Sequence, residues 1–217
     1  NNNELEKIFQ KYNDKINLIG HFAAQPSHDK SADDLLLDFD VNARATLQLL
    51  ELTRKYCPGA VFEFTSTNKV LGDTPNRLPL KEYETRFEFD DEHFMNGIDE
   101  NMSVDKSGHS PFGVSKLYAD CAVQETGRYF GIKTVCFRLG CLSGKNHHGS
   151  QQHGFLDYII KCAVSGTKYT VNGYKMKQVR DNLDFSDLCE AFYEFYKMPR
   201  VAEVYCLGGG HENSIWM

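Results

Sequence analysis

The sequence lacks the features that mark several large classes of protein. It contains no apolar run of the roughly 18 residues that a membrane-spanning helix requires. It also lacks a basic cluster, and its formal net charge is −6, which argues against nucleic acid or an anionic membrane as a partner. The polar stretch at residues 1–6 has no initial Met, so we expect neither a signal peptide nor a natural amino terminus there.

Disulfide and metal patterns are also missing. The seven cysteines are an odd number with irregular spacing, and none forms a Cys-x-x-Cys pair. This pattern predicts reduced thiols in a cytoplasmic protein rather than a disulfide framework. Cys141, His147, His148 and His153 gather in the sequence, but their spacing fits no common zinc motif, and we expect no metal site.

What is present is the composition of an ordinary globular domain. Hydrophobic residues make up 41% of the 217 positions and charged residues 25%, which is typical of a soluble protein with a substantial core. Strand-like and helix-like segments alternate, and this pattern predicts an α/β fold with a parallel sheet. The expected strands cover 16–22, 60–64, 134–139, 169–171 and 203–207, and the expected helices cover 5–12, 31–56, 110–130, 155–165 and 186–196.

Several residues are typical of helix boundaries. Ser31 and Ser186 are expected to cap two helices through their hydroxyl groups. Ser110 followed by Pro111 is a common start for another helix, and Gly131 is a common end. Residues 72–105 form a long polar stretch rich in turn residues, which we expect to be a functional or disordered loop.

The first candidate site lies where the second expected strand ends. Thr65, Ser66 and Thr67 stand there in succession. Ligands of open α/β sheets bind beyond the carboxyl ends of the strands, and hydroxyl groups there can hydrogen-bond a ribose or a reacting alcohol. The alternative interpretation is a polar turn.

A second candidate is Lys116, in the segment 109–116. It follows Phe112 by four residues, so the two side chains share one face of the expected helix. A Lys in this position can bond a ribose and lower the pKa of a nearby hydroxyl. The alternative is a solvated surface Lys.

Two further candidates stand near other expected strands. Ala23 and Ala24 are small residues that permit close approach of a ligand to the backbone. Arg180 could clamp a diphosphate, because a guanidinium group binds two phosphate oxygens at once. A surface ion pair with the neighbouring Asp181 is the alternative role for Arg180.

Together, in this order and spacing, these stretches resemble the extended short-chain dehydrogenase/reductase family, which includes NAD-dependent epimerases and dehydratases. The resemblance covers essentially the whole chain. The runs 23–29, 66–70 and 178–181 look most like proteins of the CDP-paratose (tyvelose) 2-epimerase type. The resemblance implies a Rossmann-like, doubly wound parallel sheet, NAD as the cofactor and a nucleotide sugar, most of all a CDP-sugar, as the substrate.

The resemblance also implies a role for each matching residue. Thr67 matches the residue that bonds the sugar hydroxyl undergoing oxidation, and Lys116 matches the Lys of a Tyr-x-x-x-Lys pair. The residues implied to line the cofactor are Ala23, Ala24, Gln25, Asn42, Thr65, Ser66 and Lys116. Those implied on the substrate side are Asn68, Asn146 and Arg180, with Arg180 near the nucleotide diphosphate.

Three departures from the family pattern bear on activity. Phe112 stands at the position of the catalytic Tyr, so the usual phenolate base is absent. No glycine-rich dinucleotide fingerprint occurs, and the three glycines at 208–210 follow a late strand. Part of the C-terminal sugar-binding region is missing as well. We therefore expect a chain truncated at both ends, with a partial NAD-binding Rossmann domain at 1–150 that lacks its first βαβ units. A partial substrate-binding region at 151–217, interleaved with late Rossmann elements, is expected to follow.

The implied function is that of an NAD-dependent nucleotide-sugar epimerase, which removes hydride from a sugar carbon and returns it with inverted stereochemistry. A catalytically silent nucleotide-sugar-binding homologue is the alternative that Phe112 favours. A 4,6-dehydratase is a second alternative, disfavoured because Asn68 and Lys69 stand where those enzymes carry Asp-Glu. The helices after Ser31 and Ser110 commonly pair subunits in this family, which implies a homodimer.

Overall fold

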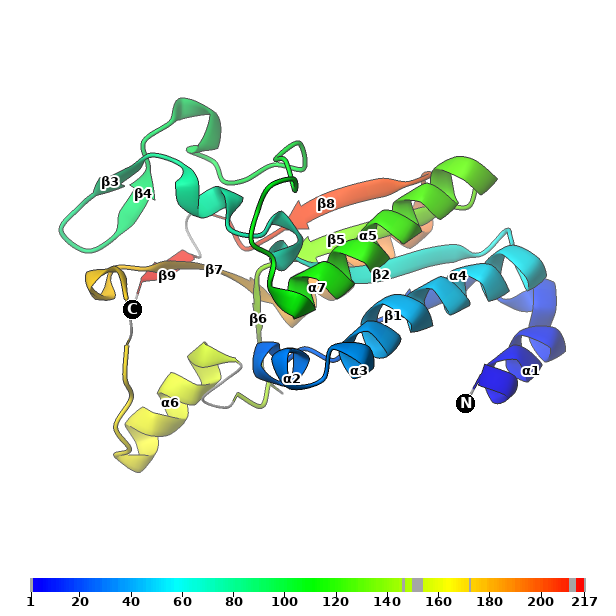
Figure 1. Ribbon diagram of the computed structural model, residues 1–217, viewed down its shortest axis with the longest axis horizontal. Coiled ribbons are helices and arrows are strands. Elements are labelled where there is room, and N and C mark those ends of the chain that lie inside the picture. The colour runs from blue at the N-terminus through cyan, green and yellow to red at the C-terminus, as the bar shows by residue number, and fades with distance from the viewer. Residues whose placement is uncertain (1, 146, 150–153, 172, 211–213, 217) are drawn as a thin grey trace.

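A parallel sheet forms the centre of the computed structural model in Figure 1, which describes residues 2–145, 147–149, 154–171, 173–210 and 214–216. The order of its four strands is β1 (Leu18–His21), β2 (Val61–Thr67), β5 (Thr134–Leu139) and β8 (Glu203–Leu207). All three pairings between neighbours are parallel. Every residue of β5 is buried, as expected for a strand with helices on both faces of its sheet.

Helices cover the two faces of this sheet. Helices α4 (Ala45–Tyr56) and α5 (Ser110–Phe130) pack on one face, where Leu50 and Val123 join Phe62 of β2 in one apolar cluster. Helix α7 (Phe185–Lys197) packs on the other face. The chain therefore has the doubly wound α/β architecture that its sequence predicts.

The segment before the sheet also packs against it. Helix α1 (Asn2–Tyr12) and a 3-10 turn, η1 (Asn13–Lys15), lead into β1. Phe9 of α1 is buried in a small cluster with Leu52 and Ala60. Within the described part of the chain, β1 pairs with β2 alone, so it lies at the edge of the sheet.

The single helix expected from Ser31 to the end of α4 is wrong. The structure has α2 (His28–Asp33), α3 (Leu35–Phe39), a π-helical turn η2 (Asp40–Arg44), and then α4. Ser31 lies inside α2 and is not a cap, because Ser27 accepts the capping hydrogen bond from the Lys30 amide. Asp34 breaks the helix with an extended backbone and caps α3.

The polar stretch at 72–105, which was expected to be a loop, contains short elements of regular secondary structure. The turns η3 (Asn68–Leu71), η4 (Thr74–Arg77) and η5 (Glu92–Phe94) lie in or next to it. Strands β3 (Leu80–Glu82) and β4 (Phe87–Phe89) form an antiparallel hairpin. Glu82 of this hairpin pairs with Lys175 and Lys177, which ties the hairpin to the chain just before β7.

A second, smaller sheet was not anticipated from the sequence. It joins β6 (Cys141–Ser143), β7 (Val179–Asp184) and β9 (Ser214–Trp216), with β7 in the middle. The strand expected at 169–171 is wrong, because that segment has no regular structure. The cap expected at Ser186 is also wrong: Asp184 caps α7 by accepting a hydrogen bond from the Ser186 amide. Helix α6 (Phe155–Ser165) matches its expected range, and η6 (Tyr174–Met176) precedes β7.

Helix α5 carries the boundaries that its sequence predicts. The cap position is His109, however, and Ser110, which was expected there, is the first residue of the helix, where its hydroxyl accepts a hydrogen bond of 3.3 Å from the Gly113 amide. Gly131 ends the helix in the left-handed conformation, with φ at 69°. Among the helices of the described residues, including this one, none is both long and apolar enough to cross a membrane.

Candidate active site

The carboxyl ends of the parallel strands form the edge at which the candidate site lies. Strand β2 ends at Thr67, and the first turn of α5 packs directly on the turn that follows. The Nδ1 atom of His109 lies 3.3 Å from the carbonyl oxygen of Lys69. A Cβ on Gly113 would lie 3.1 Å from that same carbonyl. The start of α5 therefore lies close to the strand end, as the family resemblance implies.

Lys116 is buried at this edge, with 3% of its surface exposed. Its Nζ donates a hydrogen bond of 2.7 Å to the carbonyl oxygen of Thr65 and lies 4.1 Å from the centre of the Phe64 ring. Burial lowers the pKa of Lys116 to about 8, because the charged form loses its hydration. Lys116 is therefore not a solvated surface residue, and part of its population is a neutral amine near neutral pH.

Phe112 lies one helical turn before Lys116 and is 7% exposed. Its carbonyl oxygen accepts a hydrogen bond of 3.0 Å from the Ser115 hydroxyl. Thr67 is partly exposed, and its hydroxyl oxygen accepts a 3.3 Å hydrogen bond from the amide of Lys69. The structure thus brings Phe112 and Lys116 to the strand end that carries Thr67, while their catalytic roles stay predictions.

The hydroxyl groups of Thr65 and Ser66, also on β2, both donate hydrogen bonds within the protein. Thr65 donates a 3.3 Å hydrogen bond to the carbonyl of His21 on β1. The Ser66 hydroxyl donates a 2.5 Å hydrogen bond to the Asp120 carboxylate on α5. The Ser66 side chain is therefore committed to α5, whereas the partly exposed Thr65 and Thr67 lie where a ligand can reach them.

A buried ion pair that was not among the predicted site residues lies next to Ser66. Arg138 of β5 donates two hydrogen bonds to Asp120, of 3.1 Å from Nε and 3.0 Å from Nη2. Gln124 adds a third donor, at 2.6 Å. The sequence signal was present, since Asp120 follows Lys116 by four residues and Arg138 interrupts an apolar strand. The pair fixes α5 against the strands that form the site.

The loop after β1 presents the two small residues that the sequence singled out. Ala23 and Ala24 are both exposed. The next residue, Gln25, makes two hydrogen bonds with Asn42. Its backbone amide donates one of 2.9 Å to Asn42 Oδ1, and its carbonyl oxygen accepts one of 3.1 Å from Asn42 Nδ2. Asn42 is buried and its side chain is bonded within the protein, so its approach to a cofactor stays a prediction.

His21, at the end of β1, is a neutral buried histidine. Burial first, and the charge of Lys116 second, lower its pKa to about 4. Its Nε2 lies 2.9 Å from the hydroxyl oxygen of Thr46, and that hydroxyl donates a hydrogen bond of 2.6 Å to the carbonyl oxygen of Asn42. Because a hydroxyl has one proton and a carbonyl only accepts, Thr46 must accept from His21, and Nε2 carries the proton.

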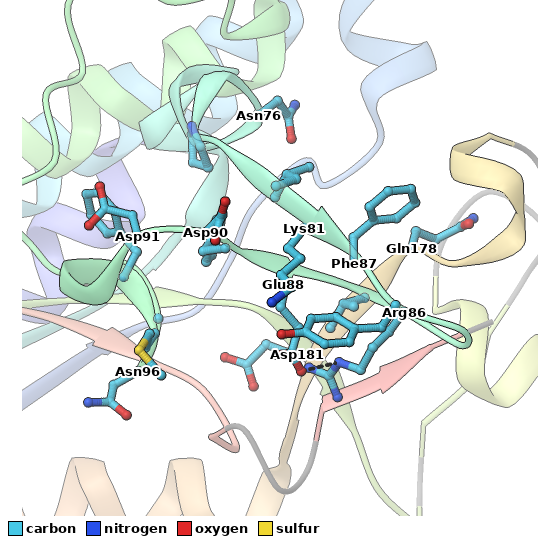
Figure 2. A pocket seen from close by; sticks show the side chains of 18 of the residues that line it. Asn76, Lys81, Arg86, Phe87, Glu88, Asp90, Asp91, Asn96, Gln178 and Asp181 are labelled. Atoms are coloured by element: carbon cyan, nitrogen blue, oxygen red, sulfur yellow. Dashed lines mark ion pairs between the residues drawn. The ribbon is translucent and has the colours of Figure 1, made fainter.

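Arg180 lies on β7, away from Lys116, and lines a separate hollow of about 700 Å³ between the hairpin β3–β4, η5 and β7. Its guanidinium is exposed, and the hydrogen bond described for it is one of 3.3 Å to the carbonyl oxygen of the neighbouring Val179. Figure 2 shows the hollow, with Arg86 and Glu88 joined by an ion pair of 3.0 Å. Arg180 is the one predicted site residue, among those with a described position, that lines it. Asn68 is exposed in η3, and Asn146 lies outside the described residues.

The three glycines at 208–210 hold a carboxylate of the protein itself. The amide of Gly209 donates a 2.9 Å hydrogen bond to Asp181 Oδ1. A Cβ on Gly208 would overlap the Asp181 carboxylate, so a larger residue there would displace this side chain. This contact explains a glycine run that does not open the first strand–helix unit of the fold, and it gives Asp181 a partner other than Arg180.

Metal ligands do not gather in the described part of the chain. No group of three or more His, Cys, Asp or Glu side chains there is placed to hold an ion. His153, one of the four residues that cluster in the sequence, lies outside the described residues. All seven cysteines are free thiols.

Comparisons with known proteins agree with this geometry. The sequence profile of the NAD dependent epimerase/dehydratase family matches residues 1–208. The chain is 31% identical to the CDP-paratose 2-epimerase of Salmonella typhi, over 99% of this chain and 63% of that protein. It therefore spans less than two thirds of the length of that relative.

Two solved structures share the fold. The UDP-glucose 4-epimerase of Thermotoga maritima, solved with UDP-glucose, superposes with a TM-score of 0.75 at 21% identity, over 100% of this chain and 62% of that one. The dTDP-glucose 4,6-dehydratase of Bacillus anthracis, in complex with NAD, superposes with a TM-score of 0.72 at 23% identity, over 100% and 57%. From the sequence profile and the identity to the Salmonella relative, the chain belongs to the NAD-dependent epimerase/dehydratase family.

Proposed function

We propose that this chain is part of an NAD-dependent nucleotide-sugar epimerase that acts on a CDP-sugar. The observation that carries the proposal is the place of Lys116, buried at the end of β2 with its Nζ on the Thr65 carbonyl. The 31% identity to a CDP-paratose 2-epimerase supports the substrate class.

The chain fits one end of the NAD cofactor that its family uses. Ala23 and Ala24 are exposed and leave room beside the strand ends, and Lys116 and Thr65 supply polar groups there. These residues would hold the nicotinamide and its ribose. The diphosphate end has no counterpart in these 217 residues, since none of their strand-to-helix turns carries the glycine fingerprint. When bound, NAD supplies the hydride acceptor of the reaction.

The chain's own residues have separable roles. Thr67 would bond the sugar hydroxyl that is oxidised. Because Phe112 has no acidic proton, we assign the base to Lys116, whose neutral amine accepts the hydroxyl proton as hydride leaves the carbon. Hydride would return to the opposite face of the same carbon and the proton to its oxygen, so the reaction is balanced and redox-neutral. Burial supports this assignment, since a pKa of about 8 makes the neutral amine accessible.

The substrate's nucleotide would lie on the side of β7. Arg180, exposed at the hollow beside the hairpin, is assigned to the diphosphate, because guanidinium groups bind phosphate in a bidentate manner. Asn68 and Asn146 are assigned to the sugar. We also propose the division into a Rossmann part, 1–150, and a substrate part, 151–217. Strand β8, in the second part, completes the main sheet, which supports the interleaving.

We further propose a cytoplasmic homodimer. Leu36, Leu47, Val114 and Tyr118 are exposed on α3, α4 and α5, and apolar side chains on neighbouring helices favour pairing of subunits. Free thiols throughout the chain favour a reducing compartment. Size-exclusion chromatography with light scattering on the full-length protein tests the dimer, and a monomer would contradict it.

A silent nucleotide-sugar-binding homologue is the second candidate, because Phe112 replaces the catalytic Tyr. A 4,6-dehydratase is disfavoured, because that reaction needs an acid–base pair to expel water, and Asn68 and Lys69 occupy the corresponding positions.

Proton NMR of the full-length protein with NAD and CDP-paratose separates the three. Interconversion of two CDP-sugars with no net reduction supports the epimerase, and Lys116→Met should abolish it. Binding without turnover identifies the silent homologue. Loss of water from the sugar identifies a dehydratase.

A further inference from the structure

Asp38 lies at the centre of a buried polar cluster, and it has no candidate role so far. It is 2% exposed, on α3. Three donor groups converge on its Oδ1 atom: the hydroxyl of Ser31 at 2.6 Å, Nε2 of Gln25 at 2.9 Å and Nδ2 of Asn42 at 3.2 Å. A carboxylate buried among donors costs its hydration, and the cost is offset only while those hydrogen bonds persist.

The cluster joins three segments on which the candidate site depends. Gln25 follows the exposed pair of alanines after β1, and Asn42 lies in the π-helical turn η2. Asn42 Nδ2 also lies 3.1 Å from the hydroxyl of Ser115 on α5, 73 residues away in sequence. Ser115 in turn donates to the carbonyl of Phe112. One carboxylate therefore connects the loop after β1 to the first turn of α5.

Asp38 also contributes to the charge around Lys116. Burial has the largest effect and lowers the pKa of Lys116, whereas Cys136 on β5, Asp120 on α5 and, least of the three, Asp38 on α3 raise it by favouring the ammonium form. His21 on β1 faces the same group and is neutral. Removing the charge of Asp38 should therefore make Lys116 easier to deprotonate.

We propose that Asp38 is a positioning residue, which holds the loop 23–25 against α5 through its hydrogen bonds and supplies a buried negative charge to Lys116. The link to catalysis rests on the proposed function. The two roles of Asp38 do not, because each is measurable in a protein without substrate.

Two substitutions separate the roles in the full-length protein. Asp38→Asn keeps the shape and an accepting oxygen and removes the charge. Asp38→Leu removes both the charge and the acceptor. Asp40→Asn is the matched control, because Asp40 lies two residues away, is exposed, and pairs with Arg44 at the surface, at 2.7 Å.

The effect of the Asp38 charge on Lys116 is measured by the pH dependence of the free energy of unfolding. Stability should rise with pH above the folded-state pKa of Lys116, since the unfolded state then binds more protons. Asp38→Asn should move the start of this rise to lower pH, and the shift should vanish in a Lys116→Met background. No shift, or the same shift in Asp40→Asn, overturns the charge role.

The hydrogen bonds are read from hydrogen–deuterium exchange of the peptide that contains residues 22–27. Asp38→Leu should raise exchange at the Gln25 amide about tenfold or more, while Asp38→Asn stays near the parent rate. Equal rates in all three proteins overturn the positioning role. If Asp38→Leu does not fold, Asp38→Ala takes its place, because it also removes the charge and the acceptor, and an exchange rate equal to that of the parent would overturn the positioning role. Absence of epimerase activity in the parent protein would refute the proposed function and leave both readouts intact.

Discussion

The Nζ of Lys116 donates a 2.7 Å hydrogen bond to the main-chain carbonyl of Thr65. This contact joins α5 to the carboxyl end of β2 and places an amine where parallel α/β sheets bind their ligands. A lysine buried in this way loses hydration, so its charge state depends on its surroundings rather than on bulk water.

The first prediction follows from that burial. Lys116 has a folded-state pKa of about 8, below the 10.5 of a free lysine, so between these values the unfolded state binds more protons. Stability of the full-length protein should therefore rise with pH across this window, by about 3 kcal/mol at most. Urea unfolding at several pH values measures it. Lys116→Met is the reference, because cysteines and tyrosines also titrate there, and equal slopes in the two proteins would contradict the prediction.

A second prediction concerns the buried pair of Asp120 and Arg138. Asp120→Ala leaves the Arg138 guanidinium buried without its partner, which should destabilise the full-length protein by about 3–5 kcal/mol. Asp40→Ala breaks an exposed pair and should cost no more than about 1 kcal/mol. Denaturant unfolding compares the two, and similar losses would show that the buried pair does not anchor α5.

Much of the sheet could be predicted from the sequence. The strand expected at 134–139 matches β5, and the helix expected at 155–165 matches α6. Both have strong local signals: β5 is buried along its whole length and reads as an apolar run, and α6 is amphipathic. Thr67 and Lys116 stand out in the sequence by their places at a strand end and on a helix, the family resemblance implies their roles, and the structure brings their segments together.

The rest depends on contacts that sequence patterns do not record. Buried and exposed side chains do not alternate regularly along strand β7, because the neighbours Arg180 and Asp181 are both exposed at the rim of the hollow. Ser31 was expected to cap a helix, but its hydroxyl bonds Asp38 within a cluster formed by three distant segments. Arg138 was hidden in an otherwise apolar strand. Tertiary structure determines all three cases, through exposure at the hollow for β7 and through side-chain hydrogen bonds for Ser31 and Arg138, and local propensity carries no information about either.

Glu63 supplies a third prediction. It is 1% exposed on β2, and its Oε1 has no hydrogen-bond partner in the described part of the chain. Burial raises its pKa to about 7, so the folded state binds more protons than the unfolded state between pH 4.5 and 7. Stability should therefore fall as pH rises through this window. Glu63→Gln should remove that fall and stabilise the protein at pH 8 by roughly 2 kcal/mol. A parent protein with the same pH dependence as the variant would contradict this.

A fourth prediction concerns the cofactor. A protein of these 217 residues alone should bind NAD weakly or not at all, because its sequence has no glycine fingerprint with which to bring backbone amides close to the diphosphate. Isothermal calorimetry measures this directly. Micromolar or tighter binding would show that the nicotinamide end supplies enough affinity by itself.

The last prediction concerns Phe112, which lies one turn before Lys116 at the position of the family's catalytic Tyr. In the full-length protein with NAD, Phe112→Tyr should raise epimerase activity by about 100-fold or more, because a phenol beside a buried ammonium is a better-placed base. Lys116→Met should abolish activity in both the parent and the Phe112→Tyr background. Tyr118→Phe is the matched control: Tyr118 is exposed on another face of α5, so its hydroxyl should not matter.

The measurement is epimer formation by NMR across pH 6–10. If Lys116 is the parent's base, parent activity should rise through about pH 8, and the Phe112→Tyr variant should be active at lower pH. A parent that binds the CDP-sugar without turnover, together with a Phe112→Tyr variant that gains activity, would instead identify the chain as a silent homologue that lost its base.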